Sequence, residues 1–337
     1  MGIKFIHTAD LHLKEDEQGF SVLRFIIEKA IKENCDAVLI AGDLFERSSF
    51  SIDLKEKVKE IFSLAPSIKI FILPGESDVD FFPADYGENV EIVNNVPFYY
   101  KKFKDVEIIG VPVQEGFTLR EILSDLKNDP QRSILLIHCT LFQEFEVFKE
   151  NIIFPVLPEE IADKFGYIAM GHYHKEMKIY RLGRFTKAVY PGSPVMLQGT
   201  TGKRKAVLVH IDSFISIEPF TIDTPYFSEK EFFVLPSEED DVLLKVELEA
   251  MQSDANKVLI IRIKGVYSKK EFREKIEEIV KKYITEFANI ILDFQAKHLT
   301  EINGYAIESF LYALKSQNVS EKIKMRAIEM FINALKW

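Results

Sequence analysis

The sequence predicts an α/β protein in which two β-sheets pack face to face with helices on their outer sides. The first observation is that short apolar runs, with the length of buried strands, alternate with segments of helical periodicity. The second is a series of short alternating runs between Ile179 and Glu218, which favours antiparallel hairpins. Helices outside two packed sheets bury both kinds of element economically.

The first half of the chain repeats strand, loop and helix. An apolar run opens it at Ile3 to Ile6, and further strands are expected at Asp36 to Ile40 and Ile68 to Leu73. Apolar residues recur at helical spacing between these runs, around Leu23 to Ile31 and around Leu54 to Phe62. Three later buried strands are expected at residues 106–111, 134–137 and 167–170.

A change of composition marks a boundary near Pro225 to Asp241, where Pro, Ser, Glu and Asp accumulate and predict a solvated segment. A small α/β module is expected beyond it, with a strand, a helix and a strand at 257–264, 269–283 and 288–294. Two amphipathic helices follow at 305–314 and 321–335. We therefore expect three parts, at residues 1–224, 225–299 and 300–337.

Composition excludes several classes of protein. No apolar run approaches the roughly 20 residues of a membrane span, and the N-terminus lacks the layout of a signal peptide, so a cytoplasmic protein is expected. Two distant cysteines, Cys35 and Cys139, provide no disulfide framework. The net charge of -10 supplies no general attraction to nucleic acid, so any such site must be local.

Metal-binding side chains cluster just after predicted strands. Asp10 and His12 follow the first strand, where a carboxylate and an imidazole can turn toward one cation. Of the seven histidines, four lie at such strand ends, whereas His7, His210 and His298 have no partner motif. The candidate ligands are Asp10, His12, Asp43, the loop Glu76 to Asp78, His138, His172 and His174.

This inventory favours two metal ions, because it exceeds the three or four ligands that one catalytic zinc takes. A bridging carboxylate is then expected. Paired divalent ions hold the oxygens of a phosphate and a hydroxide nucleophile, which predicts phosphoester hydrolysis. Mn is the expected metal, with Fe or Zn as alternatives.

Five motifs resemble those of calcineurin-like metallophosphoesterases, and in particular the SbcD-type nuclease subunits of DNA double-strand-break repair. They are His7-Thr-Ala-Asp-Leu-His-Leu, Gly42-Asp43-Leu-Phe-Glu-Arg, His138, Gly171-His172-Tyr-His174 and Tyr190-Pro-Gly-Ser-Pro194. The resemblance implies an αββα metallophosphoesterase sandwich that holds one ion at Asp10, His12 and His174. The other ion would lie at His138 and His172, and Asp43 would bridge the two.

The same resemblance assigns the rest of the chain. The module after residue 224 resembles the family's capping domain over a DNA groove. The C-terminal helices lie where that family meets its SbcC-type ATPase, and a homodimer is implied as well.

The third loop departs from the family pattern. Where the family has Gly-Asn-His-Asp, this chain has Gly75-Glu76-Ser77-Asp78. Glu76 can supply an oxygen ligand, with Asp78 in support, but its added negative charge weakens the attraction of an ion pair for phosphate. Ser77 occupies the position of the catalytic His, and loss of such an acid–base costs about a hundred- to ten-thousand-fold in rate. Attenuated catalysis is expected.

Three functions therefore stay open from the sequence. The chain is a Mn-dependent nuclease subunit acting with an ATPase, a metal-binding scaffold without catalysis, or a hydrolase of small phosphodiesters. Basic residues at Lys203-Arg204-Lys205, and at Lys175, Lys178, Arg181, Arg184 and Lys187, either follow a phosphate backbone or form a solvated hairpin surface. We favour the nuclease, because six of seven ligand positions keep the metal-binding chemistry of the family.

Overall fold

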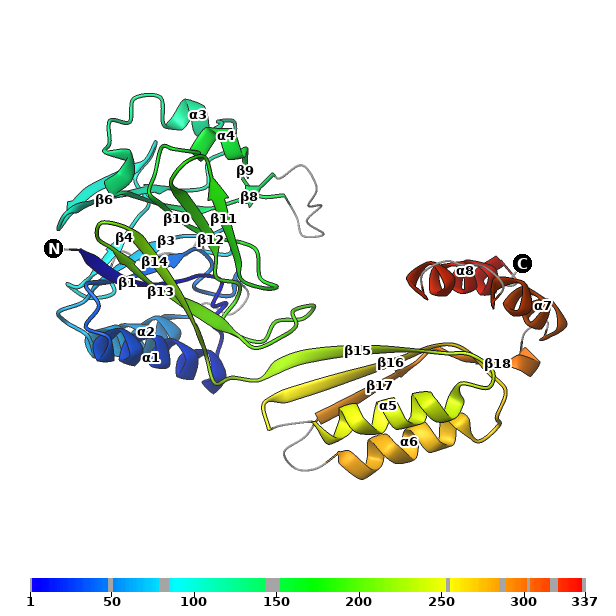
Figure 1. The fold of residues 1–337 in the computed structure, drawn as a ribbon. Coiled ribbons are helices and arrows are strands. Elements are labelled where there is room, and N and C mark those ends of the chain that lie inside the picture. Colours follow the sequence, from blue (N-terminus) through cyan, green and yellow to red (C-terminus); the bar gives the residue numbers. More distant parts are fainter. Residues whose placement is uncertain are drawn as a thin grey trace. The chain divides into compact units, whose positions relative to one another are not determined.

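The protein is described by a computed structural model, which covers residues 2–47, 51–78, 85–142, 152–252, 255–284, 289–301, 304–315 and 321–334. The chain divides into two compact units, Met1–Thr224 and Pro225–Trp337 (Figure 1). The first unit contains every candidate metal ligand named above.

The first sheet of this unit has the order β14-β13-β1-β2-β3-β4. Strands β1 to β4 run parallel, and β13 pairs antiparallel with β1. Its strands are β1 (Ile3–Thr8), β2 (Ala37–Ala41), β3 (Lys69–Leu73), β4 (Val90–Ile92), β13 (Lys205–Ile211) and β14 (Ile215–Thr221). Helices α1 (Glu17–Lys32) and α2 (Ile52–Ser63) bury their apolar faces in one cluster with this sheet.

Both helices begin at the residues that their sequences favour. The side chain of Asp16 accepts a hydrogen bond from Gly19 N at the start of α1, and Ser51 accepts one from Leu54 N at the start of α2. Such capping side chains satisfy backbone N–H groups that the helix itself leaves without a partner.

The second sheet has the order β11-β12-β10-β7-β6-β5. Its strands are β5 (Tyr99–Phe103), β6 (Val106–Val111), β7 (Ser133–His138), β10 (Tyr167–Gly171), β11 (Lys178–Leu182) and β12 (Thr186–Tyr190). Short elements accompany it, namely α3 (Leu119–Ile122), the 3-10 helix η2 (Pro130–Arg132), α4 (Pro158–Ile161) and the pair β8 (Thr140–Leu141) and β9 (Pro155–Val156). A cluster on one face includes Leu119 and Ile161 of these short helices.

The two sheets of the first unit face each other across an apolar core. Phe5 and Phe71 of the first sheet and Leu136 and Tyr167 of the second belong to one fully buried cluster. Helices pack on the outer sides, as Figure 1 shows for α1 and α2. This arrangement confirms the predicted α/β fold with two packed sheets.

The second unit is a β-α-β-α-β arrangement followed by two helices. Its strands β15, β16 and β17 run parallel in that order, and β18 pairs with β16. The elements are β15 (Tyr226–Val234), α5 (Glu239–Met251), β16 (Lys257–Tyr267), α6 (Phe272–Tyr283), β17 (Asn289–Phe294), β18 (Lys297–His298), the 3-10 helix η3 (Leu299–Glu301), α7 (Gly304–Lys315) and α8 (Glu321–Ala334). One apolar core joins α5 and α6 to the sheet.

The segment Pro225 to Asp241 is largely accessible to solvent, as expected, but it forms regular secondary structure. Nine of these residues form β15, which pairs with β16 along its length. The exposed charges Glu229, Lys230 and Glu231 interrupt the apolar pattern of the strand, so it has no periodicity of a buried strand. The acidic run lies largely in the first turn of α5, where negative charge is stabilised by the helix dipole.

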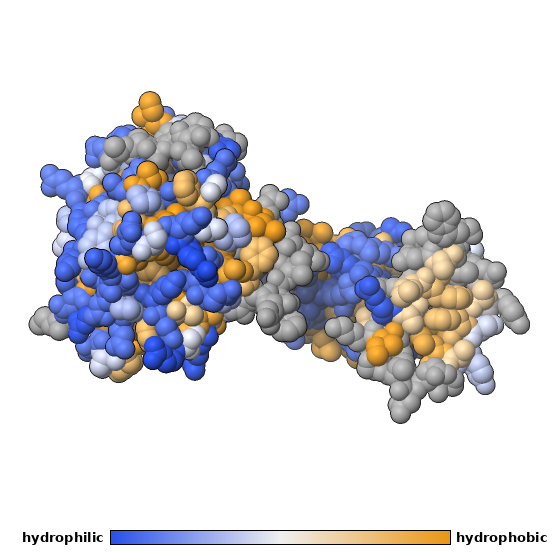
Figure 2. All heavy atoms as spheres, turned by 90° about the horizontal axis from the view of Figure 1, so that it is seen from above, coloured by the Kyte–Doolittle hydropathy of each residue, from blue (hydrophilic) through white to orange (hydrophobic). Residues whose placement is uncertain are grey.

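Helices α7 and α8 bury a small apolar cluster in the second unit. Leu311 and Ile328 are buried in it together with Val266 of β16. Three large side chains remain exposed on the same helices, namely Tyr312, Ile323 and Met330. Figure 2 shows hydrophobic patches among hydrophilic residues on one face of the molecule. Among the described residues, no helix has the length and apolar character needed to span a membrane.

Candidate metal centre

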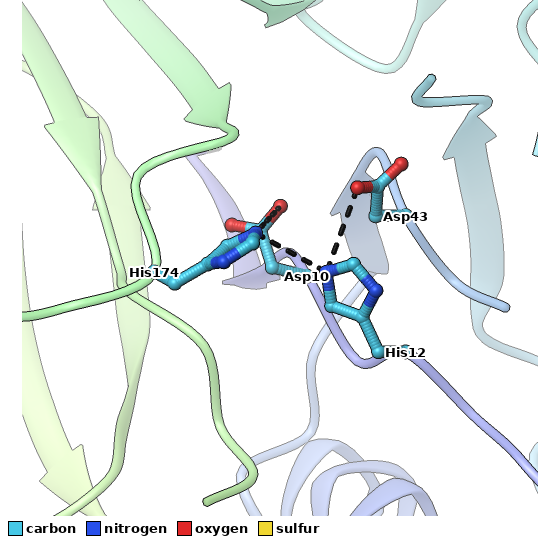
Figure 3. A group of neighbouring side chains, drawn as sticks. All are labelled: Asp10, His12, Asp43 and His174. Carbon is cyan, nitrogen blue, oxygen red and sulfur yellow. Dashed lines mark hydrogen bonds and ion pairs between the residues drawn. The ribbon is translucent and has the colours of Figure 1, made fainter. Parts of the chain in front are cut away.

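Loops at the carboxyl ends of five strands bring the candidate ligands together. Asp10 and His12 follow β1, Asp43 follows β2, and the Glu76 loop follows β3. His138 ends β7, and His172 and His174 follow β10 in the other sheet. The carboxyl ends of parallel strands are where open α/β sheets bind ligands. Figure 3 shows Asp10, His12, Asp43 and His174 directed toward one another from these loops.

The backbone is strained in three of these loops, those after β1, β2 and β10. Asp10, His12, Asp43 and His172 have φ values of 56°, 44°, 50° and 98°, in the left-handed region that side chains other than glycine avoid. Such strain concentrates at functional sites, where the surrounding structure enforces it. Gly42, next to Asp43, has a φ of 95°, and a Cβ atom there would lie 1.9 Å from Nδ1 of His138.

We expect Gly42→Ala to destabilise the protein by about 1–3 kcal/mol more than Gly116→Ala, because the added methyl group must displace the His138 ring. Gly116 is the matched control, since it also has a positive φ of 81° but a Cβ there meets nothing within 4 Å. Urea unfolding of both variants measures the difference. Equal losses would contradict the close packing of Gly42 against His138.

The first ligand group contains Asp10, His12, Asp43 and His174, whose donor atoms all lie within 4.8 Å of one another. Nε2 of His12 lies 3.1 Å from Nε2 of His174 and 3.5 Å from Oδ2 of Asp43. Two ligands at about 2.1 Å from a cation, set at right angles, lie about 3.0 Å apart. The spacing and the donor types therefore fit one divalent ion.

The second group contains Glu76, His138 and His172. The carboxylate of Glu76 contacts Nε2 of His138 through Oε2 and lies 3.2 Å from Nδ1 of His172 through Oε1. Nδ1 of His138 lies 2.9 Å from the carbonyl oxygen of Ala41. When Nδ1 carries the proton and donates it to this oxygen, Nε2 is the nitrogen that faces the other ligands of the second group. These donors also fit one divalent ion.

Asp43 belongs to the first group and also lies close to the second. Its Oδ2 is 3.5 Å from Nε2 of His12 in the first group and 3.8 Å from Nε2 of His138 in the second. Ser77 orients this carboxylate, because its backbone N donates to Oδ1 at 2.9 Å and its hydroxyl donates to Oδ2 at 3.2 Å. Ser77, which stands where the family has its catalytic His, thus contacts the Asp43 carboxylate directly.

Burial shapes the charge of the centre. Burial and the Asp43 carboxylate raise the pKa of Asp10 to about 8, whereas burial lowers the pKa of His174 to about 3. Burial alone would lower the pKa of His138, but the carboxylates of Asp43, Glu76 and Asp10 raise it to about 10. The buried carboxylates thus create a negative potential that holds a proton on His138, and the same potential attracts cations.

Asp78 holds two of these loops together. Its carboxylate is buried and accepts hydrogen bonds from the backbone N of Leu44, Phe45 and Gly75, at 3.0, 2.9 and 3.0 Å. Burial and the charge of Asp43 raise the pKa of Asp78 to about 7. Asp78 therefore fixes the Asp43 loop against the Glu76 loop without joining either ligand group.

Glu46 contacts the centre although the sequence patterns do not reveal it. Its Oε2 lies 3.2 Å from Nδ1 of His12, the ring atom opposite the one that faces the ligand group. The sequence shows that Glu46 follows Asp43 by three residues. Its contact with His12 depends on how the loop after β2 approaches the loop after β1, which the sequence does not show. Of the remaining histidines, His7 lies 2.9 Å from the Tyr167 hydroxyl, and none of the three belongs to either group.

Comparison with known proteins identifies the class of this fold and site. Residues 3–176, more than half of the chain, match the calcineurin-like phosphoesterase family. The chain therefore belongs to this family, which confirms the family predicted from its motifs and, with it, the prediction of a phosphoesterase.

Individual relatives extend the similarity. The chain is 25% identical to the DNA double-strand break repair protein Mre11 of Archaeoglobus fulgidus, over 93% of this chain and 83% of that one. It is also 25% identical to the uncharacterized metallophosphoesterase YhaO of Bacillus subtilis, over 62% of this chain and 57% of that one. A dimetal phosphatase structure from Danio rerio matches 65% of this chain and 96% of its own, at 9% identity and a TM-score of 0.43.

Proposed function

We propose that this chain is a metal-dependent DNA nuclease of the double-strand-break-repair type. The observation that carries the proposal is the position of Asp43, whose Oδ2 lies 3.5 Å from a ligand atom of one group and 3.8 Å from a ligand atom of the other. A carboxylate shared in this way is what a pair of ions requires. The similarity to a DNA double-strand break repair protein over 93% of the chain supports DNA as the substrate.

Each side chain then has a role in the centre. Asp10, His12 and His174 would hold one ion, Glu76, His138 and His172 would hold the other, and Asp43 would be shared between them. When bound, two divalent ions supply positive charge to the phosphate oxygens and activate the attacking water. Ser77 and Asp78 keep the Asp43 carboxylate in place. We propose Mn as the native metal, because the donor set mixes carboxylate and imidazole, with Fe or Zn as alternatives.

Attenuated activity follows from the third loop. Glu76 adds a third carboxylate to a centre that already contains Asp10 and Asp43, which lowers the net positive charge offered to an anionic phosphate. The Ser77 hydroxyl donates to Asp43, and a hydroxyl does not titrate near neutral pH. No positioned acid therefore protonates the leaving oxygen from this loop.

The same observation favours a second candidate function, a metal-binding scaffold that does not cut DNA. In this case the ions would hold the five ligand-bearing loops together, and the chain would act as a binding platform for its partner protein. Hydrolysis of small phosphodiesters is a third candidate, which the additional unit after residue 224 disfavours, because a small substrate does not need it.

A Mn titration with two substrates separates these functions. We expect the wild-type chain to cleave a linear DNA duplex and bis-p-nitrophenyl phosphate slowly, with rates that rise with Mn and vanish with a chelator. Cleavage of the small ester but never of DNA would support the small-substrate enzyme. Silence on both substrates with the metal bound would support the scaffold.

Further assignments concern partners and place. We propose that the second unit caps the bound DNA and that the exposed Tyr312, Ile323 and Met330 of α7 and α8 contact an SbcC-type ATPase, since exposed apolar patches mark interaction sites. A homodimer is proposed from the family resemblance. The buried free cysteines Cys35 and Cys139 suit a reducing compartment, so we propose action in the cytoplasm.

We expect Glu46→Gln to weaken Mn binding by about 10–100-fold, because a carboxylate beside Nδ1 of a ligand histidine favours the tautomer with its proton on Nδ1 and raises the basicity of Nε2. Calorimetric titration measures the affinity, and Glu46→Asp should restore part of it. The control is Glu56→Gln, at an exposed glutamate of α2. Unchanged Mn affinity in Glu46→Gln would refute this role of Glu46.

A further inference from the structure

A cavity of about 540 Å³ lies in the first unit next to the metal centre. Three segments line it, namely residues 175–177, residues 191–193 and residues 201–205, which lead into β13. Thr221 at the end of β14 completes the lining. Its cationic lining residues are Lys175, Lys203, Arg204 and Lys205, and its acidic one is Glu176. The cavity therefore has an excess of positive charge in a chain whose net charge is -10.

Backbone hydrogen bonds connect this cavity to the metal centre. Ser193, which lines the cavity, donates from its backbone N to the carbonyl oxygen of His174 at 3.0 Å. Its hydroxyl donates to the carbonyl oxygen of Asp10 at 2.8 Å. Both of these partners belong to the first ligand group. The wall of the cavity and the two ligand residues Asp10 and His174 are thus joined through backbone carbonyl oxygens.

Arg204 gives the cavity a buried positive charge. Its side chain is only 3% exposed, and its donors point to the carbonyl oxygens of five residues, which are His174, Lys175, Ser193, Thr201 and Gly202. Within the part of the chain that the structure describes, no carboxylate forms an ion pair with it. A buried charge without a counter-charge is costly, and an anion in the adjoining cavity would offset that cost.

Arg204 also makes the cavity rigid. Its hydrogen bonds fasten residues 201–202 to residues 174–175 and 193, so the walls keep their separation without a ligand. Lys203 and Lys205 flank this anchor and line the cavity with it. A site whose cations are already in place loses less free energy on ordering when an anion binds.

We propose that this cavity binds a backbone phosphate of the DNA strand, next to the phosphodiester held at the metal centre, with Lys203 and Lys205 as its main contacts. The inference rests on the proposed nuclease function and adds a subsite to it. The volume suits a nucleotide unit, since ligand sites typically measure about 300–1,000 Å³. Lysine contacts of this kind bind phosphate without reading the base.

The salt dependence of DNA binding tests the subsite without any cleavage. Binding of a short blunt duplex is measured with a chelator present, over a series of salt concentrations. Each lysine that contacts a phosphate contributes about 0.9 to the slope of log K against log salt. We therefore expect Lys203→Gln with Lys205→Gln to lower the slope by about 1.8, and each single variant to lower it by about half as much.

Two further variants control for effects on folding and for general charge. Lys203→Arg with Lys205→Arg keeps the charges and should keep the wild-type slope. Lys127→Gln removes an exposed lysine that does not line the cavity, and it should also leave the slope unchanged. An unchanged slope in the double Gln variant would overturn the inference, as would an equal loss in Lys127→Gln.

A mononucleotide distinguishes a DNA phosphate from a free nucleotide. If the wild type binds the mononucleotide and the double Gln variant does not, while the duplex slope stays unchanged, the cavity serves a free nucleotide and the inference fails. Failure of the proposed function has a separate sign, which is that the wild type cleaves no linear DNA duplex at saturating Mn, whatever the slope of DNA binding.

Discussion

The double variant Glu76→Asn with Ser77→His is expected to hydrolyse bis-p-nitrophenyl phosphate about a hundred- to ten-thousand-fold faster than the wild type, the range that a positioned acid–base contributes. Asn keeps an oxygen ligand at the second group while removing one negative charge from it. The Ser77→His change introduces an imidazole at the position whose hydroxyl now lies 3.2 Å from Asp43 Oδ2. Saturating Mn and a pH series measure the gain.

The single variants separate the two causes. Glu76→Asn alone should strengthen binding of the anionic substrate, and Ser77→His alone should add a titrating group to the pH profile of the rate. Glu115→Asn with Ser124→His makes the same changes at exposed positions and should leave the rate as it is. A double variant that binds two ions and shows no gain would contradict the account of attenuation.

Asp43→Asn is expected to lower the Mn-dependent rate by more than a hundred-fold. Even partners outside the ligand set change metal affinity or activity by about 10–100-fold, and a bridging ligand serves both ions. An amide is neutral and cannot offer two anionic oxygens to two cations. The rate at saturating Mn and the affinity for Mn measure the loss.

The thermal stability of the metal-free protein distinguishes this loss from unfolding. Burial and the Asp43 charge raise the pKa of Asp10 to about 8, so Asp10 holds a proton near neutral pH when no cation is bound. Asp43→Asn keeps the size of the side chain, and its metal-free form should still unfold in one cooperative transition. Asp125→Asn, at an exposed position, should change neither property. A rate equal to that of the wild type in Asp43→Asn would contradict the bridging role of the Asp43 carboxylate.

Much of the centre could be predicted because its ligands follow strands directly. In a parallel sheet, the residue after a strand lies at the edge where ligands bind, so Asp10, Asp43 and His172 were placed by local pattern alone. The contact of Glu46 with His12 could not be predicted, since it depends on the approach of two loops. The hydrogen bonds from Ser77 to Asp43 likewise need the fold of both loops.

The secondary structure could likewise be predicted only where a local sequence pattern marks it. Strands with continuous apolar runs, such as β2 and β7, were evident because they are buried on both faces. The sequence does not reveal strand β15, because exposed charges occupy its middle and the strand is held by pairing with β16. Helix α5 begins with acidic residues that resemble a solvated run, although they suit the start of a helix.

Metal content tests the two-ion centre most directly. Purified protein is loaded with Mn, passed through a desalting column and analysed for metal, alongside Asp43→Asn and the control Asp125→Asn. The account predicts about two ions per chain in the wild type and in Asp125→Asn, and fewer in Asp43→Asn. Fewer than about one ion per chain in the wild type would contradict it.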